Sequence, residues 1–264
     1  MISLYTTAFN LKDFDVDLDD AFSNWLYYVD EIVIGTLRKD HEDVREKITS
    51  SKYYDPKRIG VVSRNLDIFQ DIYWDGKLKN ASLENCKHSV SIQVDLDERL
   101  SGDKQGYIEI AKEISKHDFP CSVMLPSINL YGDLDHFVDI GYKWYMHTRE
   151  QTFRGPVNFA LKNDGSFDPE KSDTCELIDE KGNLIPCIGK IAVTNNDPKV
   201  IHLGFLDIER RANLNKNFWK DIWSERKSLS RKKKVEATNV LTDPTDFNPP
   251  SKLHNFPQPL WPKL

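Results

Sequence analysis

Two hydrophobic patterns alternate along the first part of the chain. Short, continuous apolar runs are typical of strands covered on both faces. They are separated by longer stretches in which apolar residues recur at helical spacing. The predicted strands are 2–5, 31–34, 59–62 and 89–97, and the predicted helices are 19–29, 40–50 and 77–87. This order predicts an α/β fold with a mixed, mostly parallel sheet flanked by helices, which binds its ligands at the carboxyl ends of the strands.

The rest of the chain is less regular. It predicts helices at 104–117 and 208–226, strands at 122–131 and 201–205, and a hairpin that turns near Lys181 and Gly182. After residue 228 a basic run, Arg231 to Lys234, precedes six prolines, which indicates an extended tail. We therefore expect one domain over 1–227, with a nucleotide-binding half (1–100) and an acceptor half (101–227), followed by a basic, then proline-rich tail (228–264).

Composition excludes several classes of function. The formal net charge of the 264 residues is −6, so the chain lacks the positive field that gathers nucleic acid. No apolar stretch approaches the roughly 20 residues that cross a bilayer, and the first residues do not resemble a signal peptide. We expect a cytoplasmic protein with no transmembrane segment. None of the four cysteines forms a CxxC pair, which disfavours a zinc ribbon. Cys175 and Cys187 flank the predicted hairpin. They could form a disulfide or remain two thiols, and the reducing cytosol favours thiols.

An acidic triplet follows the fourth predicted strand. In the segment SVSIQVDLDE, Asp95 and Asp97 have the same parity, so both carboxylates point to one side if the strand continues through them. Like charges this close are stabilised by a cation. Carboxylate oxygens suit Mn²⁺ or Mg²⁺, which complete their shell with diphosphate oxygens. The competing interpretation is an ordinary acidic turn, since Asp is common where strands end.

The segments around this triplet resemble the family 2 glycosyltransferases of GT-A fold, which is a Rossmann-like arrangement. The similarity lies in Lys79-Asn80-Ala81-Ser82-Leu83, in Val94 to Arg99 with its DxD motif, and in Trp25 to Ile34. It covers residues 1–100 well and residues 140–225 loosely. The resemblance implies a nucleotide-sugar donor of UDP or GDP type, a glycan or other hydroxyl acceptor, and inversion at the anomeric carbon.

The resemblance also implies roles for individual residues. Asp95 would contact the ribose or the metal, and Asp97 would be the principal metal ligand. A late histidine often completes such a site; His202 is the candidate, and His147 is its competitor. The implied nucleotide-sugar contacts are Thr6, Thr7, Asp40, Lys79 and Asn80. Arg149 and Arg154 could bind phosphate or an acidic sugar, because a guanidinium matches such oxygens in bidentate fashion.

The chain departs from the family in two places. Its second strand runs into Gly35-Thr36-Leu37 instead of an Asp-Gly-Ser-like turn, and the second half lacks the usual short acidic motif that carries the base. Glu150, Asp133 and Asp135 remain as candidates for the catalytic base. Two alternatives therefore stay open. One is a noncatalytic nucleotide-sugar or glycan-binding protein of the same fold, and the other is a nucleotidyltransferase, although residues 5–15 lack a glycine-rich phosphate loop.

Overall fold

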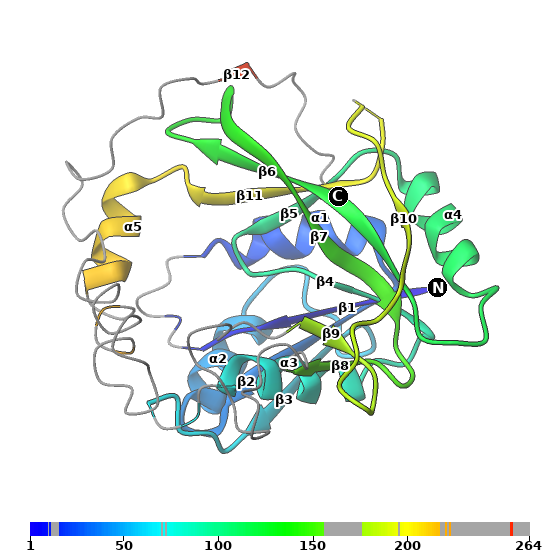
Figure 1. Ribbon diagram of the computed structural model, residues 1–264. Coiled ribbons are helices and arrows are strands. Elements are labelled where there is room, and N and C mark those ends of the chain that lie inside the picture. The colour runs from blue at the N-terminus through cyan, green and yellow to red at the C-terminus, as the bar shows by residue number, and fades with distance from the viewer. Residues whose placement is uncertain are drawn as a thin grey trace, which may run out of the picture.

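The computed structural model describes residues 1–9, 11, 16–69, 71, 73–155, 176–194, 196–216, 220, 222 and 254–255. These residues form an α/β fold built on one large, curled sheet with helices on both faces (Figure 1). None of the helices in these ranges combines the length and the apolar character needed to span a bilayer.

The large sheet has the strand order β3-β2-β1-β4-β7-β6-β11-β5, with β10 added beside β6 and β12 beside β7. The strands in that order are β3 (Ile59–Arg64), β2 (Glu31–Leu37), β1 (Ile2–Thr7), β4 (Val90–Gln93), β7 (His136–Thr148), β6 (Ser122–Tyr131), β11 (Lys199–Phe205), β5 (Glu98–Ser101), β10 (Cys187–Lys190) and β12 (His254–Asn255). The predicted α/β architecture is confirmed.

The first four strands, β1 to β4, pair with one another in parallel. β1 lies between β2 and β4, with Tyr5 opposite Val33 on one side and Gln93 on the other. β7 runs antiparallel to both β4 and β6, so β6 and β11 point the same way as β1. The carboxyl ends of β1, β2, β4, β6 and β11 therefore share one edge of the sheet, which is where the sequence predicted the ligand site.

Helices cover both faces because the strands alternate their side chains. Leu4, Ile32 and Ile34 belong to the core that packs α1 (Leu18–Tyr28), α2 (His41–Thr49) and α4 (Lys104–Ile114) on one face. Tyr5 and Val33 face α3 (Trp74–Glu84) on the other. α3 can pack closely on β2 because residue 35 is glycine. A Cβ there would lie only 2.3 Å from the Ser82 hydroxyl.

Aspartate side chains mark where three helices begin. Asp17, Asp103 and Asp207 each accept a hydrogen bond from a backbone N–H of the first turn, at the starts of α1, α4 and α5 (Ile208–Leu214). The predicted helices at 19–29, 40–50 and 104–117 are confirmed with ends shifted by a few residues. The predicted helix 77–87 begins three residues earlier, at Trp74. The short η1 (Arg38–Asp40) leads into α2.

A long antiparallel hairpin of β6 and β7 extends past the parallel strands (Figure 1). The sequence predicted β6 but not β7, which spans thirteen residues. The predicted strand 89–97 was too long, because β4 ends at Gln93 and β5 begins at Glu98. Near the hairpin tip, β12 pairs with His136 and Phe137 of β7. The remainder of the predicted tail, 228–264, lies outside the described residues.

A small second sheet pairs β8 (Phe153–Gly155) with β9 (Glu176–Ile178). The predicted turn is present, since Gly182 has a positive φ of 79° and its N–H donates to Asp179 O at 3.0 Å. Cys187 is exposed in β10. Its proposed partner, Cys175, lies outside the described residues, so the pairing stays untested.

Candidate active site

The acidic triplet lies in the turn between β4 and β5, at the carboxyl edge of the sheet. The backbone leaves the strand after Gln93, so the parity argument does not apply, and Asp95 and Asp97 bond to different neighbours. Their side chains are 42% and 26% exposed, whereas the next acid, Glu98, is fully buried. A ligand arriving from solvent can therefore reach both aspartates.

Asp97 faces His202, the late histidine that the sequence analysis named as a candidate ligand. Asp97 Oδ2 lies 3.3 Å from His202 Nε2, and His202 Nδ1 donates to Asn129 Oδ1 at 2.8 Å. Gly204 makes this approach possible, because a Cβ there would lie 2.7 Å from the imidazole and 3.0 Å from Asp97 Oδ2. Burial opposes both charges. The hydrogen bond with His202 nevertheless lowers the pKa of Asp97 to about 2, and Asp97 raises the pKa of His202 above its ordinary value.

Asp95 faces the opposite direction, toward α3. Its Oδ1 lies 3.4 Å from Lys79 Nζ and accepts a hydrogen bond from Gln93 Nε2 at 2.9 Å. Lys79 also pairs with Asp75, one helical turn earlier, at 3.0 Å. Burial alone would raise the pKa of Asp95, but the ammonium groups of Lys79 and Lys143 outweigh it and hold that pKa below its usual range. The predicted residues Lys79 and Asp95 are thus direct neighbours.

Arg154 joins this cluster from β8. Its Nε donates to the Tyr5 hydroxyl at 3.1 Å, and its second guanidinium nitrogen donates to Gln93 Oε1 at 3.1 Å. Asn80 holds the backbone of Arg154 with two hydrogen bonds, donating to its carbonyl at 2.8 Å and accepting from its N–H at 2.7 Å. The amide of Asn80 is therefore used to position Arg154.

Glu98 supports the turn from below. Its Oε2 accepts the backbone N–H of Asp95 at 2.8 Å, while Oε1 accepts from Tyr145 at 2.7 Å and from Lys143 at 3.1 Å. Because three donors surround this buried acid, it fixes the conformation of the Asp95 turn. Burial, with Asp95 nearby, raises the pKa of Glu98.

Two cations that the sequence did not single out also lie here. Lys143 comes from β7, a strand that was not predicted, and its ammonium influences the pKa of Asp95. Arg211 comes from the first turns of α5 and acts on the pKa of Asp97. Arg211 could have been found from the sequence, because a predicted helix follows the predicted strand 201–205 and so begins near the same edge of the sheet. No pattern around Lys143 indicated its position.

The three candidate bases lie in two separate places, and neither place is the Asp95–Asp97 turn. Asp133 and Asp135 are exposed in the β6–β7 turn, and Asp133 lies 2.8 Å from His136 Nδ1. Glu150 lies at the opposite edge of the sheet, because the preceding Arg149 bonds through its N–H to Ser89, before β4 begins. Glu150 is therefore not brought to Asp95 and Asp97.

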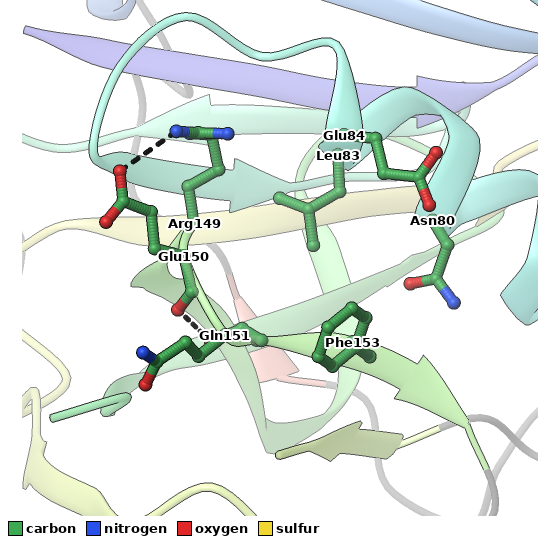
Figure 2. A pocket seen from close by; sticks show the side chains of 8 residues that line it. Asn80, Leu83, Glu84, Arg149, Glu150, Gln151 and Phe153 are labelled. Atoms are coloured by element: carbon green, nitrogen blue, oxygen red, sulfur yellow. Dashed lines mark hydrogen bonds and ion pairs between the residues drawn. The ribbon is translucent and has the colours of Figure 1, made fainter. Parts of the chain in front are cut away.

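Glu150 and Arg149 instead line a separate cleft of about 290 Å³ between α3 and the β7–β8 turn (Figure 2). They form an ion pair with each other at 3.1 Å, and Leu83 and Phe153 provide apolar lining. Arg149 therefore lies beside this cleft and not beside Asp95 and Asp97.

The remaining predicted residues lie at the ends of β1 and β2. Thr6 and Thr7 end β1, and Asp40 precedes α2. The Thr6 hydroxyl and Asp40 Oδ2 are buried without a hydrogen-bond partner in the described part of the chain.

His147, the competing ligand, is fully buried in β7. Its Nδ1 donates to Thr148 O at 2.7 Å, and its Nε2 accepts from the Tyr5 hydroxyl at 2.8 Å. Both of its ring nitrogens are thus engaged.

The described residues contain no group of three or more His, Cys, Asp or Glu side chains arranged to hold a metal ion. Asp97 Oδ2 and His202 Nε2 nevertheless face each other across a position that Gly204 keeps free of a Cβ. Mg²⁺ is commonly held by one or two protein groups together with substrate phosphates and water. This donor pair therefore fits a divalent cation that completes its shell with a bound diphosphate.

The sequence matches no protein-family model and no curated protein. Among solved structures, residues 1–349 of S. aureus TarS share 11% identity, with 91% of this chain and 69% of that chain covered and a TM-score of 0.40. HddC from Yersinia pseudotuberculosis shares 17% identity over 56% of this chain and 72% of that one, with a TM-score of 0.35.

The inositol-1-phosphate CTP transferase from T. maritima shares 8% identity over 86% of this chain and 97% of that one, with a TM-score of 0.34. This chain spans only 21% to 36% of the length of three other TarS structures, two of which contain UDP or UDP-GlcNAc. At these scores the likeness carries no argument about function.

Proposed function

We propose that this chain is a metal-dependent glycosyltransferase of the family 2-like, GT-A type. In this proposal it moves a sugar from a UDP- or GDP-linked donor to an acceptor hydroxyl with inversion. The observation that carries the proposal is the pair formed by Asp97 and His202, 3.3 Å apart at the carboxyl edge of the sheet. Asp95 lies two residues away in the same exposed turn, and cationic side chains surround it.

Asp97 and His202 are the proposed metal ligands, and Asp95 contacts the metal or the ribose. A divalent cation, Mn²⁺ or Mg²⁺, supplies positive charge that stabilises the leaving diphosphate. Asn129 and Gly204 keep the two ligands facing each other. Glu98 is not assigned as a ligand, because its side chain is fully buried. It supports the turn that carries Asp95 and Asp97.

In this proposal the diphosphate of the donor binds to the cationic side chains around Asp95 and Asp97. Lys79 and Arg154 provide positive charge on the α3 side of Asp95, and Lys143 and Arg211 provide it on the other side. Fixed cations in a partly buried site stabilise developing negative charge without reorganising during the reaction. Thr6, Thr7 and Asp40, at the ends of β1 and β2, are the proposed contacts of the nucleoside, and Asn80 acts by positioning Arg154.

The proposed reaction is a single displacement. The acceptor oxygen forms a bond to the anomeric carbon while the bond from that carbon to the diphosphate oxygen breaks, and the electron pair leaves with the nucleoside diphosphate. The hydroxyl proton passes to a carboxylate acting as general base. Asp133 and Asp135 are the candidates on the β6–β7 hairpin, whose turn lies at this edge of the sheet, whereas Glu150 lies at the opposite edge.

A thermal-shift panel of UDP- and GDP-sugars, with and without Mn²⁺, tests the proposal directly. A ligand that binds the folded state raises its apparent stability, by about 2.7 kcal/mol at a hundredfold excess over Kd. We expect one nucleotide class to stabilise the wild type only when Mn²⁺ is present. Asp97→Asn should abolish that effect, whereas Asp118→Asn, an exposed aspartate between α4 and β6, should retain it.

Product analysis then separates the competing functions. Release of nucleoside diphosphate from the sugar donor supports glycosyl transfer. Release of pyrophosphate from a nucleoside triphosphate and a sugar phosphate would instead identify a nucleotidyltransferase. Metal-dependent stabilisation without turnover of either kind would identify a noncatalytic binding protein, and full turnover by Asp97→Asn would refute the metal assignment.

A further inference from the structure

The cleft between α3 and the β7–β8 turn has charged and apolar parts (Figure 2). Arg149 and Glu150 lie at one end of it, and the side chains of Leu83 and Phe153 line its apolar part. Its volume is about 290 Å³. Ligand-binding clefts usually hold about 300 to 1,000 Å³, so this one suits a molecule much smaller than a nucleotide sugar.

Asn80 lies between this cleft and the proposed donor site. It lines the cleft, and its amide bonds through both polar atoms to the backbone of Arg154. The guanidinium of Arg154 extends instead to Tyr5 and Gln93, on the donor side. The described lining of the cleft includes none of the proposed metal ligands or diphosphate-binding cations, so the two sites are separate.

The guanidinium of Arg149 is only half used as a carboxylate-binding fork. Its Nη2 donates to Glu150 Oε1 at 3.1 Å, while its Nε is buried without a hydrogen-bond partner in the described part of the chain. These two nitrogens donate from the same side of the guanidinium and match the two oxygens of one carboxylate. The Glu150 side chain is 75% exposed, and an exposed ion pair of this kind contributes little. A ligand carboxylate that engages both donors can therefore replace Glu150.

The other lining residues restrict the kind of carboxylate that fits. Glu84 and the displaced Glu150 both carry negative charge, which disfavours a dianionic phosphate and favours a ligand with its own cationic group. Leu83 and Phe153, which is 37% exposed, favour an apolar body between them. A carboxylate, an adjacent ammonium and an apolar side chain together describe an apolar α-amino acid.

The backbone of the β7–β8 turn is also unusual at the cleft. Gln151 has a φ of 56°, and it is the one non-glycine residue with a positive φ in the ranges that the structure describes. Glycine adopts this conformation at lower cost, and such strain is typical of binding sites. The hydroxyls of Thr148 and Thr152 are hydrogen-bonded at 3.0 Å and close the turn. The turn thus holds Arg149, Glu150 and Gln151 at the cleft.

We propose that this cleft binds a free apolar α-amino acid of about the size of leucine or phenylalanine. The carboxylate takes both donors of the Arg149 fork, the ammonium pairs with Glu150, and the side chain lies between Leu83 and Phe153. Charge complementarity selects this occupant, since each end of the zwitterion meets a group of opposite sign. This binding site is additional to the proposed donor site and does not depend on it.

NMR titration tests the site with L-leucine and L-phenylalanine as probes. Analogues remove one recognised group at a time. 4-Methylpentanoate and 3-phenylpropanoate lack the ammonium, 3-methylbutylamine and 2-phenylethylamine lack the carboxylate, and glycine lacks the apolar side chain. We expect at least one of the two amino acids to bind, and its analogues to bind about tenfold more weakly. Binding of neither amino acid, or equal binding of the analogues, would overturn the proposal.

Substitutions of the ion pair should change affinities in different directions. Arg149→Gln should raise Kd about tenfold for the amino acid and for its carboxylate analogue. Glu150→Gln removes both the ammonium partner and the competing carboxylate, so the amino acid should bind more weakly and the carboxylate analogue more tightly. A folding defect would weaken both ligands, so these opposite changes identify the site. Unchanged affinity in Arg149→Gln, or parallel changes in Glu150→Gln, would rule it out.

Two further variants locate the binding. Arg45→Gln, an exposed arginine of α2 on the other face of the sheet, is the matched control and should bind the amino acid like the wild type. Asp97→Asn should also retain amino-acid binding. Loss in Asp97→Asn with retention in Arg149→Gln would place the ligand in the donor site and refute the cleft. If no nucleotide sugar binds while amino-acid binding depends on Arg149, the transferase proposal fails and the cleft proposal stands.

Discussion

His202 donates through Nδ1 to Asn129 Oδ1 at 2.8 Å, and this bond orients its other ring nitrogen toward Asp97. An amide oxygen can only accept, so Nδ1 carries a proton and Nε2 is the nitrogen presented to Asp97 Oδ2. Asn129 lies opposite His202 on the neighbouring parallel strand, so the backbone pairing of β6 and β11 holds the two side chains together. The Asn129 amide thus determines which ring nitrogen of His202 is left for a metal.

Removing that amide should weaken metal binding without touching a ligand. For Asn129→Leu we expect the Kd for Mn²⁺ in the presence of nucleoside diphosphate to rise about 10- to 100-fold, the usual effect of losing such an outer partner. Isothermal titration or the electron spin resonance of free Mn²⁺ measures it. Asn129→Asp keeps an oxygen acceptor and should bind Mn²⁺ nearly as well as the wild type. Equal Mn²⁺ affinity in Asn129→Leu and wild type would contradict this role.

Gly204 provides a second test of the same pair. In Gly204→Ala the new Cβ would lie 2.7 Å from the His202 ring and 3.0 Å from Asp97 Oδ2, so the two side chains must separate. We expect Mn²⁺-dependent stabilisation by a nucleotide sugar to disappear. Gly60→Ala is the matched control, because that glycine also lies in a strand and a Cβ there meets nothing within 4 Å. Thermal unfolding of both variants with and without Mn²⁺ separates the two outcomes.

The parallel half of the fold could be predicted because its signals are local. Each buried strand there is a continuous apolar run, and each helix carries its own stripe, so β1, β2, β3 and the helices between them follow from short windows of sequence. The position of Asp95 and Asp97 at the carboxyl edge followed from the same order. Their same-facing orientation did not, because it assumed a strand through residue 97 that ends at Gln93.

The parts of the site that the sequence did not predict depend on contacts between residues far apart along the chain. β7 contains glycine, lysine and several aromatics without a strict two-residue period, and only its pairing with β4 and β6 makes it a central strand. Lys143 could not be placed without that strand. The Tyr5–Arg154 hydrogen bond joins residues 149 positions apart, and no local pattern indicates such a contact. The family resemblance named Lys79 and Asp95 as separate candidates, and only the fold brings them within 3.4 Å of each other.

Asn80 offers a test of whether Arg154 must be held in place. Asn80→Ala removes both hydrogen bonds to the Arg154 backbone and leaves a partly buried N–H unpaired, which should lower the free energy of unfolding by about 1–3 kcal/mol. Because the guanidinium loses its anchor, nucleotide-sugar affinity should fall as well. Urea denaturation and a donor titration measure the two effects.

Asn85→Ala is the control for that experiment. Asn85 follows the same helix, and its amide donates only locally, to Ala81 O at 2.8 Å. We expect a smaller loss of stability, about 0.5–1.5 kcal/mol, and unchanged donor affinity. If both variants lost donor affinity equally, Asn80 would act through the stability of α3 and not through Arg154.

His147 makes the stability of the protein depend on pH. Burial, with Arg154 nearby, lowers its pKa to about 3, whereas an unfolded histidine has a pKa of about 6.5. Between these values the unfolded chain binds one proton more than the folded protein, so the free energy of unfolding rises with pH across this window and levels off above it. The neutral ring is needed because Nε2 accepts from Tyr5 and Nδ1 donates to Thr148 O.

Urea denaturation at pH 5 and pH 7.5 measures this contribution through a comparison of variants. Wild type should lose about 2 kcal/mol more than His147→Gln on going from pH 7.5 to 5, because the variant has no imidazole to protonate on unfolding. Carboxylates common to both proteins cancel in the difference. His117→Gln, at the end of α4, retains His147 and should keep the wild-type slope. A His147→Gln slope equal to that of wild type would show that the imidazole takes up its proton over the same pH range in the folded protein as in the unfolded chain.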